Sequence, residues 1–187
     1  CEMCIRDRVT TAARLGALKI VGKEIGSIRV VMSGAGAAGI AVGKMLLANG
    51  VKDLTLCDRE GALHLGRQRM NSAKEEMAGL TNPRNLRGSL ADCMKGADVF
   101  VGVSAKGLVS QDMVHSMAKD AIVFPMANPE GEISVEEARQ AGAAVAGDGR
   151  TINNALGFPG IFRGTINAGA KSITPGMLAA AARTLAG

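Results

Sequence analysis

Aromatic residues are almost absent from this sequence of 187 residues, which contains no tryptophan, no tyrosine and four phenylalanines. The formal net charge of +5 would otherwise suggest nucleic-acid binding. Proteins that bind single strands, however, stack bases on aromatic side chains, and this chain offers no such platform. We therefore expect no nucleic acid as a partner. A solvated surface is expected where basic residues gather after residue 58, at Arg67, Arg69, Lys74, Arg84 and Arg87.

Cysteine and histidine are also scarce. The four cysteines, Cys1, Cys4, Cys57 and Cys93, are scattered and form no disulfide framework. Cys1 and Cys4 make a C-x-x-C that could be half of a zinc site, but no second pair completes it and the chain has two histidines. We expect no metal site in this chain. Residues 1–8 are interpreted as an unmatched leader to a truncated chain, and residues 9–187 as one domain.

Long apolar runs are missing, so no membrane-spanning segment is expected, and no signal peptide is visible. The expected location is therefore the cytoplasm. The hydrophobic content of 47% is enough to bury the core of a single domain.

The most informative stretch present is residues 28–58. Ile28–Met32 is a short β-branched run typical of a buried strand, and it leads into Ser33–Gly39, which fits G-x-G-x-x-G. A helical apolar pattern follows until Asn49-Gly50, and a second strand over residues 54–57 ends at Asp58. A lone glycine-rich turn is weak evidence. Strand, turn, helix, strand and terminal acid in this order predict a dinucleotide site.

Each residue type in this unit has a physical reason. Glycine permits the tight turn, the approach of a pyrophosphate to bare backbone and the close packing of helix on sheet. Helix N-terminal amides then face the phosphates. Asp58 can accept hydrogen bonds from the adenosine ribose. The expected cofactor-binding residues here are Gly34, Ala35, Gly36, Ala37, Ala38, Gly39, Asp58 and Arg59.

Strands and helices alternate along the rest of the chain, which predicts an α/β fold: a Rossmann-type, doubly wound parallel sheet of about five strands with helices on both faces. The expected helices cover residues 9–21, 72–80, 89–96, 110–118, 134–140 and 174–185, and the further strands residues 97–103, 122–127 and 143–146, with a loop over 59–69.

Ligands in such sheets bind at the carboxyl ends of the strands. Those ends carry Gly34, Asp58, Ser104, Asn128 and the segment after Ala146, so we expect one cleft to collect them. From the residues alone, Asn128-Pro129 is better explained as a plain turn and Asn153-Asn154 as a helix cap than as binding residues.

Several motifs in this order resemble the NAD-binding domain of malic enzymes of the bacterial type, from about Thr11 to the end. They are SGAGAAGIAVGKMLL (33–47), LCDREGAL (56–63), residues 74–107, MANPEGEI (126–133) and NNALGFPGIFRGTINAGAKSI (153–173). The resemblance implies oxidative decarboxylation of malate to pyruvate and CO2, with NAD or NADP as hydride acceptor and Mg²⁺ or Mn²⁺ in the full-length enzyme. It also implies that Asn128 and Asn154 lie near the nicotinamide and the substrate, and that Asn153 belongs to the same group. Ser104 is expected to contact the cofactor because it lies at the end of its strand, and Asn128 and Asn153 are expected to contact it as well. Asn154 would bind a malate carboxylate.

The resemblance is incomplete in ways that matter for activity. The family's general acid is a tyrosine, its base a lysine, and both, with the metal-binding carboxylates, lie upstream of the matching region. This chain has no tyrosine, so we expect no catalytic residue within it and no activity from it alone. About five residues of the family pattern are missing between Arg150 and Asn153, His64-Leu65 replaces a more polar pair, and the leader has no counterpart.

The expected partners are malate or pyruvate, an upstream substrate domain and further copies of the same enzyme. Two other functions stay open: a stand-alone dinucleotide-binding module without chemistry, and a related dehydrogenase such as one acting on amino acids. Asp58 favours NAD over NADP because a carboxylate repels a 2′-phosphate. Arg59, Arg67 and Arg69 act in the opposite direction.

Overall fold

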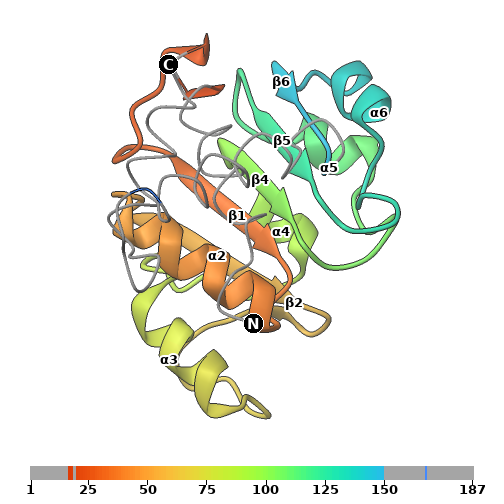
Figure 1. The fold of residues 1–187 in the computed structure, drawn as a ribbon. Coiled ribbons are helices and arrows are strands. Elements are labelled where there is room, and N and C mark those ends of the chain that lie inside the picture. Colours follow the sequence, from red (N-terminus) through yellow and green to blue (C-terminus); the bar gives the residue numbers. More distant parts are fainter. Residues whose placement is uncertain (1–16, 19, 150–166, 168–187) are drawn as a thin grey trace.

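A single twisted sheet forms the centre of the computed structural model, which describes residues 17–18, 20–149 and 167 (Figure 1). Its strand order is β3-β2-β1-β4-β5-β6. The five parallel strands are β1 (Arg29–Ser33), β2 (Asp53–Asp58), β4 (Val99–Gly102), β5 (Ile122–Pro125) and β6 (Val145–Ala146). The Rossmann-type parallel sheet expected from the sequence is therefore confirmed.

Helices cover both faces of this sheet. They are α2 (Ala37–Ala48), α3 (Ser72–Leu80), α4 (Leu90–Met94), α5 (Gln111–His115) and α6 (Val135–Gln140). Alternate residues of each strand point to opposite faces, as the pleat requires. Val30 and Met32 join the core under α2 and α3, whereas Val31 between them joins the core under α4, α5 and α6. Two hydrophobic layers therefore sandwich the sheet.

The helix starts follow from local capping chemistry. Asn71, Ser89, Ser110 and Ser134 each accept a hydrogen bond from a backbone N–H in the first turn of the helix that follows. At Ser89 and Ser134 an acidic residue three positions on completes a capping box. These helices were expected at these positions, and α3 spans the expected residues 72–80.

One strand was not expected. The predicted loop over residues 59–69 contains β3 (Gly61–Ala62), which pairs antiparallel with the end of β2. Gly61 has a φ of +105°, and a Cβ added there would lie 2.1 Å from the carbonyl oxygen of Gly88. The backbone of Ala62 donates to that carbonyl. A two-residue strand made by backbone pairing leaves no hydrophobic pattern for a sequence to reveal.

Several expected elements lie outside the described residues: the leader over residues 1–8, Asn153 and Asn154, and the helix over residues 174–185. Of the first expected helix, Ala17, Leu18, Ile20 and Val21 are described and helical, and Gly22 follows with a φ of +66°. None of the helices described is long and apolar enough to cross a bilayer.

Candidate functional site

The carboxyl ends of four neighbouring strands meet at one edge of the sheet. Gly34 N donates to Cys57 O at 2.8 Å, Val103 N to Ser33 O at 2.8 Å, and Met126 N to Gly102 O at 3.0 Å. The ends of β2, β1, β4 and β5 are therefore consecutive. The chain moves outward from β1 to β2 and then returns to β4 on the other side of β1. This reversal between β1 and β4 is the switch point at which open α/β sheets bind ligands.

The glycine-rich turn lies at this switch point. Gly34 has a φ of +118°, and a Cβ there would be 3.0 Å from the carbonyl oxygen of Val103. A Cβ on Gly39 would be 1.8 Å from the carbonyl oxygen of Gly34, so only glycine lets α2 pack this close to the turn. A Cβ on Gly36, by contrast, would have no heavy atom within 4 Å. Gly34 and Gly39 are therefore needed by the fold, and Gly36 is not.

The N-terminus of α2 is open to a ligand. Gly36 caps the helix without any side-chain hydrogen bond, and the first turn carries no acidic residue. Gly36, Ala37 and Ala38 are exposed, whereas Ala35 and Gly39 are buried. The first N–H groups of a helix lack intrahelical partners and carry partial positive charge. Exposed amides beside a glycine with free space fit the pyrophosphate of a dinucleotide.

Asp58, at the end of β2, is largely buried, with its side chain 13% exposed. Its Oδ1 accepts from Arg67 at 2.9 Å and from the backbone of Glu60 at 3.0 Å. Its Oδ2 accepts from Arg67 at 2.5 Å and from Lys74 at 2.6 Å. Burial raises the pKa of this carboxyl, but the bonds from Arg67 and Lys74 lower it more, so the pKa lies well below its usual value.

This arrangement corrects part of the sequence interpretation. Arg67 and Lys74 were expected to belong to a solvated surface, but their side chains are only 10% and 24% exposed and both pair with Asp58. Arg69, Arg84 and Arg87 are exposed as expected. Arg59, expected at the cofactor, is also exposed and makes no ion pair with any residue that the structure describes. The three side chains of Asp58, Arg67 and Lys74 together carry one positive charge.

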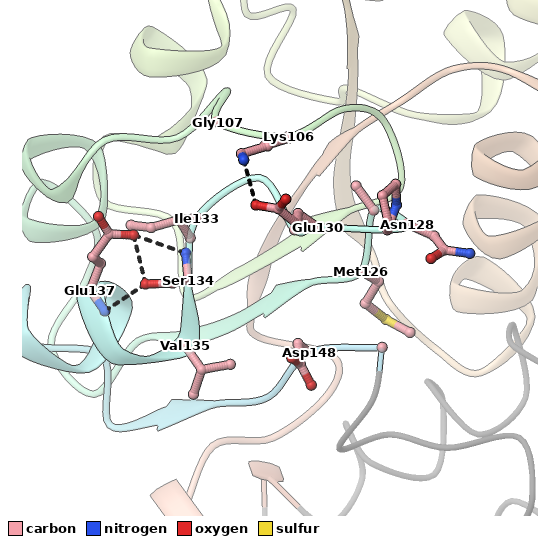
Figure 2. Close-up of a pocket in the computed structure, with 14 residues that line it drawn as sticks. Lys106, Gly107, Met126, Asn128, Glu130, Ile133, Ser134, Val135, Glu137 and Asp148 are labelled. Atoms are coloured by element: carbon pink, nitrogen blue, oxygen red, sulfur yellow. Dashed lines mark hydrogen bonds and ion pairs between the residues drawn. The ribbon is translucent and has the colours of Figure 1, made fainter.

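Ser104 and Asn128 lie beyond the glycine turn, after β4 and β5, and both are exposed. Asn128 lines a cavity of about 490 Å³ that the loop after β5, the start of α6 and the segment after β6 enclose (Figure 2). Lys106 and Glu130 form a 2.5 Å ion pair beside it. Asp148 lines the cavity from the segment after β6 (Figure 2).

Sequence reasoning missed Glu132, which is completely buried between the ends of β4 and β5. A glutamate in a loop is normally exposed, so nothing in the local pattern indicated burial. The weak signal was Gly102 at the end of β4, because a Cβ there would lie 2.0 Å from Glu132 Oε2. In the part of the chain described, no three His, Cys, Asp or Glu side chains come close enough to hold a metal ion.

Comparison with known proteins also indicates a dinucleotide-binding domain. Residues 7–152 match the family described as malic enzyme, NAD binding domain. The chain is 50% identical over 184 residues to a bifunctional malic/malolactic enzyme of Bacillus subtilis, covering 95% of this chain and 45% of that protein. It is 49% identical to an NAD-dependent malic enzyme of Geobacillus stearothermophilus and 41% identical to an NADP-dependent malic enzyme of Halomonas elongata. Each alignment covers 95% of this chain, and 38% and 43% of those proteins.

Solved structures agree. An NAD-dependent malic enzyme of Thermotoga maritima superposes with a TM-score of 0.83 at 38% identity, covering 87% of this chain and 45% of that one. The chain thus spans less than half the length of these relatives. A family match over most of the sequence, together with the glycine turn at the switch point, shows that this chain belongs to the malic enzyme NAD-binding domain family.

Proposed function

We propose that this chain is the cofactor-binding part of an enzyme that converts malate to pyruvate and CO2 and reduces NAD or NADP. One observation carries the proposal. The exposed amides at the start of α2, beside the unobstructed Gly36, lie at the switch point between a polar end at Asp58 and another at Asn128. From β2 to β5 there are three strand spacings, roughly 15 Å, which suits an extended dinucleotide.

Each part of the cofactor has a proposed position in the site. The pyrophosphate would bind the amides of Gly36, Ala37 and Ala38. The adenosine ribose would then lie toward Asp58, Arg67 and Lys74, which leaves the nicotinamide near Ser104 and Asn128. When bound, the cofactor accepts the hydride from malate. The residues of this chain hold and orient it.

The acid–base and metal chemistry is proposed to come from a domain of the same enzyme that this chain does not include. The chain has no tyrosine to serve as the family's general acid. Asn154 is proposed to donate to a malate carboxylate, and Asn153 to lie beside it. An asparagine can donate to a carboxylate without adding a competing charge. The division of the chain at residues 8 and 9, a cytoplasmic location and assembly into a homo-oligomer stay predictions.

The preference for NAD also stays a prediction. The sequence-based reason for it was an unpaired carboxylate at Asp58. In the structure, the two oxygens of Asp58 already accept the four hydrogen bonds described above. A 2′-phosphate would therefore meet Arg67 and Lys74 as well as an acid. We expect any preference for NAD to be weaker than an unpaired aspartate would impose.

The test is to purify the full-length enzyme and follow malate-dependent reduction of NAD and of NADP, with Mg²⁺ or Mn²⁺ present. We expect reduction of at least one cofactor together with stoichiometric pyruvate and CO2. Screening amino acids and other 2-hydroxy acids in parallel tests the dehydrogenase alternative, which the family match does not favour. Cofactor binding without oxidation of any of these substrates would instead support a stand-alone binding module.

A further inference from the structure

Two loops beside the nicotinamide end of the proposed site are held together by one residue, Glu132. The first loop joins β4 to α5 and carries Ser104, and the second joins β5 to α6 and carries Asn128. Glu132 Oε1 accepts from the backbone of Ser104 at 2.8 Å, and Oε2 accepts from the backbone of Ala127 at 3.3 Å. Its carboxylate thus contacts the backbone at, or one residue before, each candidate cofactor residue.

The backbone of the same segment strengthens this connection. Glu132 O accepts from Val109 N at 3.0 Å, and Gly131 O accepts from Gly107 N at 3.3 Å. Hydrogen bonds therefore join the two loops both at the strand ends and further out. The Lys106–Glu130 ion pair bridges the same two loops at the surface, but there it is exposed to solvent and contributes little.

The surrounding sequence makes room for the carboxylate. Gly102 is the last residue of β4, and any side chain there would occupy the position of Glu132 Oε2. A Cβ on Gly131 would lie 2.8 Å from the carbonyl oxygen of Pro125. Two glycines, one at the end of β4 and one in the loop after β5, are thus needed to seat Glu132 across the strand ends.

Stability alone does not explain a glutamate at this position. Burial raises the pKa of Glu132, and the backbone amides of Ser104, of Glu132 itself and of Ala127 oppose that rise only in part. No cation pairs with it in the part of the chain that the structure describes. Burying a charged group costs free energy unless it is paired with an opposite charge as well as hydrogen-bonded. A buried carboxylate that only amides satisfy is therefore better explained by what it holds in place.

We propose that Glu132 is a positioning residue: it fixes the distance between Ser104 and Asn128 so that the nicotinamide half of the cofactor binds in one orientation. This inference rests on the proposed function, because it assumes that the dinucleotide extends from the glycine turn toward β5. Glu132 itself contacts no reacting atom.

The test uses the full-length enzyme with Glu132→Gln and Glu132→Asp. Glutamine keeps the size of the side chain but turns an NH2 group toward one of the two amide donors, so one hydrogen bond is lost. Aspartate keeps the charge but is one CH2 shorter and cannot reach both amides. Glu136→Gln is the matched control, because Glu136 is exposed on α6 and outside the cavity.

For Glu132→Gln we expect the affinity for the reduced cofactor, measured by its fluorescence, to fall about tenfold, as for one lost hydrogen bond to a charged group. Backbone hydrogen exchange should become faster in peptides covering residues 103–107 and 126–128. The kcat should also fall at a temperature at which the variant is still fully folded. Glu132→Asp should recover part of the affinity, and Glu136→Gln should match the wild type. The proposal would be overturned if the folded Glu132→Gln variant kept the cofactor affinity of the wild type, with or without a lower Tm. It would also be overturned if neither variant folded. Cofactor affinity and exchange remain measurable if the wild type does not oxidise malate, so the two proposals fail separately.

Discussion

In the proposed site, Asp58 would determine which ribose group of the adenosine half can bind. Its two oxygens already accept four hydrogen bonds, two of them from one guanidinium. A bidentate arginine–carboxylate pair has a fixed geometry. Arg67 neutralises the charge of Asp58, so the net positive charge of the cluster is that of Lys74. A ribose hydroxyl would have to share acceptors with Arg67 and Lys74. A ribose phosphate would instead gain two cationic partners.

This arrangement predicts a cofactor-dependent effect of Arg67→Met in the full-length enzyme. We expect the KM for NADP to rise about tenfold, because one charged hydrogen bond to the 2′-phosphate is lost, and the KM for NAD to change less. Steady-state kinetics with both cofactors measure the difference, with Arg87→Met as an exposed control. Equal changes in the two KM values would show that Arg67 only supports Asp58.

The same cluster predicts a pH-dependent contribution to stability. Because its pKa is lower in the folded chain than the 3.8 of a free aspartate, Asp58 stabilises the fold above pH 3.8. This stabilisation is lost progressively as the pH falls from there towards the pKa of the folded state. Asp58→Asn should therefore lower the free energy of unfolding near neutral pH, on the order of 1–3 kcal/mol. The difference from the wild type should shrink below about pH 4. Denaturant titrations at several pH values test this. A difference independent of pH would show that the ion pairs contribute nothing.

Neither Arg67 nor Lys74 could be assigned to Asp58 from the sequence. The acid is placed by the end of a strand, a pattern that hydrophobic periodicity reveals. The cations lie nine and sixteen residues further on, and only the folded path of β3 and α3 returns them to it. Glu132 was not predicted for a related reason: its partners are backbone amides, and one of them, Ser104 N, belongs to another loop 28 residues away.

At the scale of elements, the sequence predicted most where local chemistry decides the structure. Ser89 and Ser134 stop the preceding loop and start helices through capping boxes that involve four consecutive residues each. Strand ends were predicted less well. The expected strand over residues 97–103 is observed as β4, Val99–Gly102, and only these four residues pair in register with β1 and β5. Pairing depends on neighbours that lie far away in sequence.

The glycine turn allows binding to be separated from folding. Gly36→Val should leave a folded protein, because its φ of −83° suits any residue and the space around it is open, yet the side chain would stand where the pyrophosphate approaches. Gly39→Ala should instead disturb the fold, because its Cβ would clash with Gly34 O. Circular dichroism and calorimetry with NAD and NADP distinguish the two. Unchanged cofactor affinity in Gly36→Val would mean that the turn has only a structural role.

At the scale of the whole molecule, we propose that the 187 residues bind the cofactor and that the reactive groups belong to another domain of the enzyme. We therefore expect the purified chain to bind NAD or NADP weakly and to show no oxidation of malate. Calorimetry measures the first and absorbance of the reduced cofactor the second. Malate-dependent reduction of NAD or NADP by this chain alone would contradict the proposal that the reactive groups lie on another domain.

We propose that Asn154 contacts the substrate, and its replacement tests that contact in the full-length enzyme. Asn154→Ala should raise the KM for malate by roughly ten- to a hundredfold, since a lost hydrogen bond to a charged group contributes about 1.5–3 kcal/mol. The KM for the cofactor should change far less. An effect confined to the cofactor would place Asn154 away from the malate carboxylate.

The short strand β3 also affects how readily molecules of this protein aggregate. The outer strand of a sheet presents unpaired backbone groups that can recruit a strand from another chain. Here β3 is two residues long, Ala62 N already donates to Gly88 O, and Arg67 Nη1 donates to the carbonyls of Gly61 and Ala62 at 3.2 and 3.3 Å. The arginine that neutralises Asp58 thus also covers the border of the sheet. Its replacement should make the protein more prone to aggregate through strand pairing between copies.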